Sequence, residues 1–207
     1  METMTPVTGR TCSLITALLL AQGHIVSAQA HPERQGVWAD LAIGEGWVHV
    51  SSDTLRGRSQ SGIDGILAFG WTPCSRVRFG VSWAQWSSRW GGGKQNWITR
   101  YDILVYYYPF ARNNFFVEAA AGPNDYSVVH VSGEQADTIY LSGHTWGPTI
   151  AAGWDAPGGP FSLRPRLTYS YGPPRNLHSG GTLLATGWKQ HLLSLDIGVV
   201  LHAPDKQ

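Results

Sequence analysis

The sequence has few charged residues and only two cysteines. Asp, Glu, Lys and Arg make up 14% of its 207 residues, against about 25% in an average soluble domain. The formal net charge of +1 gives no basic surface of the kind that nucleic acids require. Cys12 and Cys74 are too few and too far apart for a disulfide framework or a cysteine metal site. We therefore expect no nucleic-acid partner, no metal and no cofactor.

The sequence also lacks an apolar run long enough for a membrane-spanning helix. Its longest candidate, "LITALLL" (14–20), is much shorter than the about 20 residues that such a helix needs. Arg10 precedes this run, and "SAQA" (27–30) follows it with the small-x-small ending that a signal peptidase cleaves. This pattern predicts a signal peptide at residues 1–30 and one mature domain at residues 31–207. An exported chain of this kind is either soluble or crosses a membrane as a closed β-barrel, the one non-helical structure that lipid permits.

Apolar and polar residues alternate through most of the mature domain. In "FSLRPRLTYSY" (161–171), Leu163 and Leu167 fall on one face of an extended chain, whereas Arg164 and Arg166 fall on the other, because strand side chains point to opposite faces in turn. A period of two predicts strands rather than helices. We predict eight strands, at residues 36–50, 60–72, 76–90, 96–109, 114–131, 139–155, 161–172 and 187–202.

The connections between these strands alternate in length. Short connectors rich in proline, glycine and asparagine are expected at residues 72–76, 109–114 and 155–160. Mostly longer polar loops are expected at residues 52–60, 91–96, 132–138 and 172–187. Short turns at one end and longer loops at the other are typical of transmembrane barrels. Pro123 and Pro148 fall inside predicted strands, where a missing N–H group predicts a bulge or a bend.

The face opposite the bulky residues carries small residues and single charges, so we predict that it lines the interior. Eight strands enclose a lumen that side chains just fill. An arginine that faces lipid near the midplane costs about 2–4 kcal/mol, whereas charges gathered inside can pair. The predicted lumenal network of four arginines and five acids consists of Asp40, Asp64, Arg78, Arg100, Asp102, Glu118, Arg164, Arg166 and Asp196.

Aromatic residues gather near the ends of the predicted strands. Their rings prefer the interface between lipid and water, and two such belts mark the borders of an outer-membrane barrel. The predicted aromatic girdle consists of Trp71, Trp83, Trp97, Tyr107, Phe115, Trp154, Phe161, Tyr169 and Tyr171.

Four stretches together resemble a known family. They are "SAQA", "AAAGPNDY" (119–126), "GPTIAAGWDAPGGPFSLRPRLTYSYG" (147–172) and the last strand, "HLLSLDIGVVLH" (191–202). The chain resembles the small eight-stranded outer-membrane β-barrels of the OmpA-like and OmpX-like kind. The resemblance implies an all-β, antiparallel up-and-down transmembrane barrel in the bacterial outer membrane. It also implies outer-membrane lipid and lipopolysaccharide as surroundings, the barrel-assembly machinery as a partner during biogenesis, and a monomer.

Two alternatives remain at this point. "GVW" (36–38) is similar to the Gly-x-Trp of lipocalins, which are soluble barrels that bind an apolar ligand inside. "HVS" occurs at residues 49–51 and 130–132, with Glu45 and Glu134 nearby, and a serine–histidine–acid set could activate a hydroxyl for acyl transfer on lipid A. We expect instead a structural or surface-interaction role without enzymatic activity, in a barrel that the charge network plugs.

Overall fold

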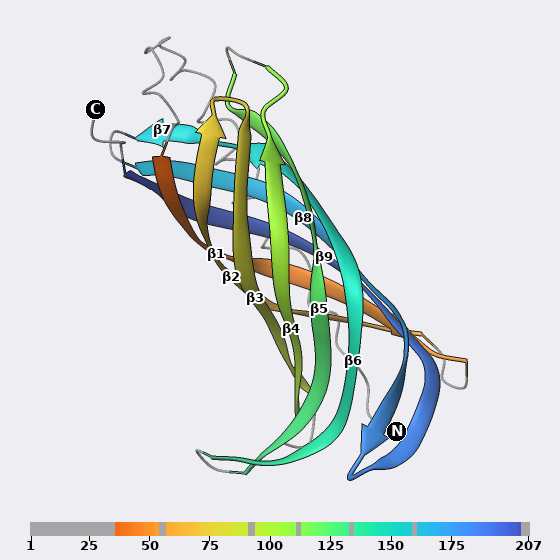
Figure 1. The fold of residues 1–207 in the computed structure, drawn as a ribbon. Helices are drawn as coiled ribbons and strands as arrows, with labels where there is room; N and C mark the ends of the chain where they lie inside the picture. Colours follow the sequence, from red (N-terminus) through yellow and green to blue (C-terminus); the bar gives the residue numbers. More distant parts are fainter. Residues whose placement is uncertain are drawn as a thin grey trace. The chain divides into compact units, whose positions relative to one another are not determined.

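Eight long β-strands and one short strand follow one another as a meander (Figure 1). This computed structural model describes residues 36–53, 57–90, 94–110, 113–132, 135–158 and 161–203, although the side chains of Trp90 and of residues 130–140 are excepted. The predicted signal peptide lies outside the described residues. Within the ranges that are described, no helix is long and apolar enough to cross a membrane.

The strands are joined in chain order and close into a ring. Their bounds are β1 (Gly36–Ser51), β2 (Arg58–Cys74), β3 (Val77–Trp90), β4 (Lys94–Tyr107), β5 (Phe115–Ser132), β6 (Gln135–Trp154), β7 (Ala156–Gly158), β8 (Phe161–Ser179) and β9 (Thr182–Ala203). All pairings are antiparallel; β1 pairs with β9 and β6 pairs with β8, so the eight long strands leave no open edge. The short β7 pairs only with the beginning of β8. The predicted all-β, eight-stranded antiparallel up-and-down barrel is confirmed.

The register of the pairs makes the strands oblique to the barrel axis. A path along the ladder from Gly44 of β1 through β2, β3, β4 and β5 reaches β6 at Gly143. The path in the other direction, through β9 and β8, reaches β6 at Gly153, ten residues away. A closed barrel with such a stagger has strands tilted by about 35–45°. The ribbon shows strands that run obliquely (Figure 1).

At one end of the barrel the strands are longer than predicted. The stretch 172–187, expected as a loop, forms the ends of β8 and β9 around a tight turn at Gly180 and Gly181, whose φ angles are 54° and 86°. These two strands contain 19 and 22 residues, about twice the 9–11 that cross a bilayer. The β5–β6 and β8–β9 hairpins therefore extend beyond the other strand pairs at the end opposite β7 (Figure 1). We call this the hairpin end, and the opposite end, where β1 begins and β9 ends, the terminal end.

Prolines mark an irregular seam between β6 and β8. No ladder pair joins the two strands between Ser142 and Thr149 of β6. Pro148 lies in this stretch, and Pro173 and Pro174 lie opposite it on β8; none of the three has an N–H group to donate. The irregularity predicted at Pro148 is thus present. Pro123 pairs with Trp146 of β6, but no ladder pair joins β5 to β4 between Asn124 and Ala121, so the irregularity predicted at Pro123 is present on that side. Pro165 keeps its ladder pair with Ile197.

The outer face of the barrel is apolar through its central part. Leu41, Ile43 and Ile103 expose 66%, 66% and 70% of their surface, and similar side chains surround the barrel on the other strands. A continuous apolar belt of this size is unfavourable in water but is what lipid hydrocarbon requires. A lipocalin-like barrel would bury its bulky face, so this arrangement excludes the soluble alternative.

Ile43→Arg tests which face meets lipid. It puts a charge on the outer face near the middle of the apolar belt. We expect the free energy of unfolding in lipid vesicles, measured by urea titration, to fall by about 2–4 kcal/mol. Ser61→Arg is the matched control, because Ser61 is exposed at the border of the belt, and it should cost less than about 1 kcal/mol. Equal losses in both variants would contradict the assignment.

Candidate functional site: the charged interior

All nine side chains of the predicted lumenal network lie inside the barrel. None exposes more than 9% of its surface, although every one carries a charge at neutral pH in water. Their inward direction follows from the alternation, since each flanks bulky residues that face outward. The nine are Asp40, Asp64, Arg78, Arg100, Asp102, Glu118, Arg164, Arg166 and Asp196.

Three arginines and two aspartates form a compact group near the terminal end, which we call the terminal cluster. Arg164 donates from Nε to Asp155 Oδ1 at 2.7 Å and from Nη1 to Asp40 Oδ2 at 3.0 Å. Arg78 Nη1 lies 3.3 Å from the other oxygen of Asp155, and Arg166 Nη1 donates to Asp40 Oδ2 at 3.0 Å. Each carboxylate thus bridges two guanidinium groups, and strands far apart in the sequence are joined across the lumen.

Aromatic rings enclose the terminal cluster. The Arg164 guanidinium carbon lies 4.6 Å from the ring centre of Tyr106 and 4.8 Å from that of Phe116, within the range of cation–π attraction. The Tyr108 hydroxyl donates to Asp155 at 2.7 Å. Trp38 packs edge-on against Tyr106, with ring centres 5.4 Å apart. These inward rings fill the lumen beside the ions, a feature that the sequence analysis did not anticipate.

Asp155 is a central member of this cluster that the sequence analysis missed. Residue 155 was predicted to end the strand 139–155 and to begin the connector 155–160, and no inward role was expected for it, yet only 3% of its surface is exposed. Thr149, Ala151 and Gly153 of β6 face inward at alternate positions, and Asp155 continues the same phase. Extending the inward alternation two residues past Gly153 would have found it.

A second group of charges occupies the middle of the lumen, and we call it the middle layer: Asp64, Arg100, Asp102 and Asp196. Arg100 Nη2 lies 3.3 Å from Asp64 Oδ2. Asp196 Oδ2 accepts hydrogen bonds from Thr168 at 3.0 Å and Ser194 at 3.1 Å. Glu118 lies between this layer and the terminal cluster, 3.9 Å from Arg166 Nη1.

A hydrophobic cluster fills the lumen towards the hairpin end. Its buried members are Val48, Trp86, Ile98, Tyr126, Val128, Leu177, Ala185, Trp188 and Leu192. Arg175 stands beside it and donates to the backbone oxygens of Asn124 at 2.7 Å and Gly143 at 3.4 Å, and it also bonds Gln190. These bonds connect β5, β6, β8 and β9 beside the proline seam, where the ladder is interrupted. We call the cluster, with Arg175 and Gln190, the hairpin-end plug.

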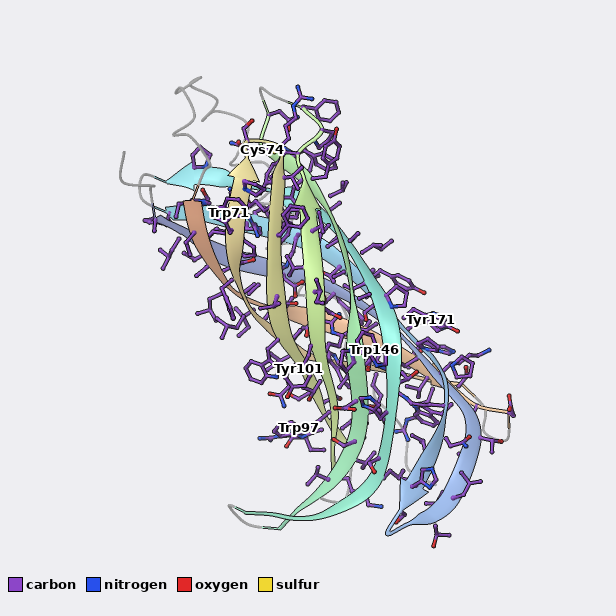
Figure 2. All side chains as sticks on the ribbon, viewed as in Figure 1. Trp71, Cys74, Trp97, Tyr101, Trp146 and Tyr171 are labelled. Carbon is purple, nitrogen blue, oxygen red and sulfur yellow. The ribbon has the colours of Figure 1, made fainter. Side chains whose placement is uncertain are left out.

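The predicted girdle residues lie on the outer face. Figure 2 shows Trp71 near the terminal end and Trp97 and Tyr171 in the half towards the hairpins. Exposed members are Trp71, Trp83, Tyr107, Trp154, Phe161 and Tyr169, and partly buried members are Trp97, Phe115 and Tyr171. Trp146, 63% exposed and drawn in Figure 2, occupies a similar place and was not predicted.

Among the described residues, the contacts of the first His-x-Ser stretch do not assemble a catalytic set. His49 Nδ1 lies 2.9 Å from the hydroxyl of Ser59, and no ion pair among the described residues joins it to a carboxylate. The side chains of His130, Ser132 and Glu134 lie outside the described part of the chain. The expected lack of enzymatic activity stays a prediction. Among the described residues, no three His, Cys, Asp or Glu side chains lie together in a way that could hold a metal ion.

The barrel shares its fold with solved bacterial surface proteins. The crystal structure of Neisserial surface protein A (NspA) matches at 13% identity and a TM-score of 0.54, covering 82% of this chain and 100% of that one. The crystal structure of Ail, the attachment invasion locus protein of Yersinia pestis, matches at 13% identity and a TM-score of 0.50, covering 81% and 99%. No family model and no curated protein sequence matches the chain. At the level of the fold, the resemblance to small eight-stranded outer-membrane barrels is confirmed, and this fold supports the predicted outer-membrane location.

Arg164→Leu and Arg100→Leu measure what the buried ion pairs contribute. Removing Arg164 leaves Asp40 and Asp155 each without one of its partners, so we expect a loss of about 3–5 kcal/mol in the free energy of unfolding in detergent. Arg100 pairs with one carboxylate in a layer rich in acids, so its loss should also destabilise the barrel. Arg89→Leu, an exposed position, is the control and should change stability by less than about 0.5 kcal/mol. Unchanged unfolding midpoints for both inner variants would show that these arginines do not stabilise the fold.

Proposed function

We propose that this chain is a closed outer-membrane barrel with a structural or surface-interaction role, performed by its β5–β6 and β8–β9 hairpins. The observation that carries this proposal is the filled interior. Terminal cluster, middle layer and hairpin-end plug follow one another along the lumen, and the extended hairpins are what the barrel offers beyond the membrane. The charge network then acts as part of a plug rather than as the lining of a pore.

The case for a plugged lumen rests on the size and fixation of the inward side chains. Trp38, Trp86, Tyr106, Tyr108 and Phe116 each expose 1% or less of their surface. Eight strands leave a space that side chains fill, and here aromatic side chains fill it beside the buried ion pairs. Several of these side chains are fixed by directed bonds, such as that from Trp86 Nε1 to the backbone oxygen of Gly46 at 3.0 Å.

The case for action at the surface rests on the two long hairpins. The β8–β9 hairpin is held by Leu177 and Trp188 of the plug and by the bond from Arg175 to Gln190. A hairpin fixed in this way presents a defined surface at low entropic cost on binding. At its tip Leu183 and Leu184 expose 50% and 56% of their surface, beyond the apolar belt. They provide apolar contact area for a partner outside the cell.

This proposal includes an orientation and a set of neighbours. The terminal end would face the periplasm, and the hairpins would point outward. Lipopolysaccharide would surround the outer half of the apolar belt, and the barrel-assembly machinery would handle the chain during insertion. We propose a monomer, since the belt is complete without a second copy.

Conductance in planar lipid bilayers tests closure. Because the lumen is filled, we expect the refolded chain to give no steady channels. A folded state is verified beforehand by faster migration in mild detergent before boiling than after it. Steady, large channels from such a sample would contradict a closed barrel.

Cysteine labelling on intact cells tests the orientation. In a Cys74→Ser background, Thr182→Cys at the hairpin tip should react with a membrane-impermeant maleimide on intact cells. The natural Cys74 is exposed at the terminal end and serves as the matched control, which should react only after permeabilisation. The reverse pattern would place the hairpins in the periplasm and overturn the proposed surface role.

A further inference from the structure

The buried acids of the lumen outnumber the buried bases that face them. Among the described residues, six acids and four arginines are buried between the terminal end and the hairpin-end plug: Asp40, Asp64, Asp102, Glu118, Asp155, Asp196, Arg78, Arg100, Arg164 and Arg166. Arg175 belongs to the plug, where its hydrogen bonds go to backbone oxygens and to an amide. An excess of two negative charges inside a membrane-spanning barrel is strongly unfavourable unless it is compensated.

The excess falls in the middle layer. In and beside the terminal cluster, Arg78, Arg164 and Arg166 face Asp40, Asp155 and Glu118, so three positive charges meet three negative ones. That leaves three aspartates around one arginine in the middle layer. Of these, Asp196 has its nearest arginine nitrogen, Arg166 Nε, 3.7 Å away, which is beyond ordinary hydrogen-bond length.

Two of the middle-layer carboxylates stand on either side of Gly44. Gly44 of β1 pairs with Asp64 of β2 and with Asp196 of β9. Both aspartates are 0% exposed, and their charges repel one another. Asp196 Oδ1 leans over Gly44 so closely that a methyl group there would collide with it. The missing side chain at Gly44 therefore lets Asp196 Oδ1 extend over β1, the strand that separates it from Asp64.

Each of these carboxylates has one oxygen without a partner. Asp64 Oδ2 is paired with Arg100, and Asp196 Oδ2 accepts from Thr168 and Ser194. The two Oδ1 atoms are buried and have no hydrogen-bond partner among the residues that the structure describes. A buried polar atom without a partner costs about 1–3 kcal/mol, and more when it carries charge. The strand register thus puts two anionic oxygens without partners on the strands that flank Gly44, which has no side chain.

We propose that the middle layer binds one small monovalent cation of the sodium class between Asp64 Oδ1 and Asp196 Oδ1, beside Gly44, where it compensates one of the two excess negative charges. Carboxylate oxygens are the hard ligands that such cations prefer, and water completes the coordination. A divalent ion fits less well, because Arg100 already neutralises Asp64 and because, within the described ranges, no third acidic ligand joins the pair. This inference does not depend on the role of the hairpins.

The test compares sodium with a cation too large to enter. The chain is refolded from urea into detergent at pH 7.5, in sodium chloride or in choline chloride of the same ionic strength, so that the site equilibrates during folding. The midpoint temperature is read from the loss of the fast-migrating form on electrophoresis. We expect the midpoint to be higher in sodium by roughly 5–10 °C at about 100 times the dissociation constant.

Two variants localise the effect. Asp196→Asn keeps the shape of the side chain but removes one excess charge, so the sodium-dependent shift should disappear and the midpoint in choline should not fall below that of the wild type. Asp40→Asn, in the terminal cluster, is the matched control; its midpoint should be lower in both salts while the shift between salts remains.

Three results would overturn the proposal. Equal wild-type midpoints in sodium and choline that fall as the pH rises from 6 to 9 would mean that a proton compensates the charge. Equal midpoints at every pH would mean that the excess is compensated without a cation. A sodium shift that survives in Asp196→Asn would place the cation elsewhere.

Discussion

Lipid hydrocarbon offers no partner to a charge or to a backbone N–H, and this constraint decides where every side chain of the barrel lies. A ring of eight strands satisfies the backbone, but only if each strand sends one face to lipid and the other to a narrow lumen. All polar side chains of the spanning segments must then share that lumen. The network around Arg164 is the result, because buried charges remain stable only when they bond one another. The inward Tyr106, Tyr108 and Phe116 belong to the same solution, since they exclude water and attract the guanidinium groups.

Where apolar and polar residues alternate clearly, the sequence alone shows which side chains face lipid and which face the lumen. In "FSLRPRLTYSY" apolar residues face lipid and arginines face the lumen, and the structure has Arg164 and Arg166 buried and Leu163 and Leu167 exposed. Beyond the membrane the outer face is polar as well, so the alternation no longer distinguishes the two faces of a strand. The stretch 172–187 therefore looked like a loop, although Leu177 and Trp188 continue the inner face of β8 and β9.

The parts of the site that sequence did not reveal have separate physical reasons. Asp155 follows a strand end where turn-forming residues dominate, and its role depends on Arg78 and Arg164 arriving from distant strands. Arg175 lies beyond Pro173 and Pro174, where an extra residue shifts the alternation, so that counting in twos points it the wrong way. The pairing of Asp64 and Asp196 across Gly44 depends on the register of three strands, and periodicity fixes a face but no register.

The seam between β6 and β8 has a consequence for the kinetics of the barrel wall. Ladder pairs between β1 and β9 are continuous, although these are the first and last of the described strands. The seam, in contrast, separates segments that are close in sequence. Closing a short loop costs less entropy than closing a long one. If β6 and β8 separate at the seam, they pair again quickly, because the segment between them is short. If β1 and β9 separate, they must find each other across the conformations of the whole chain. Strand pairing in the barrel is thus weakest at the seam between β6 and β8, where it also re-forms fastest.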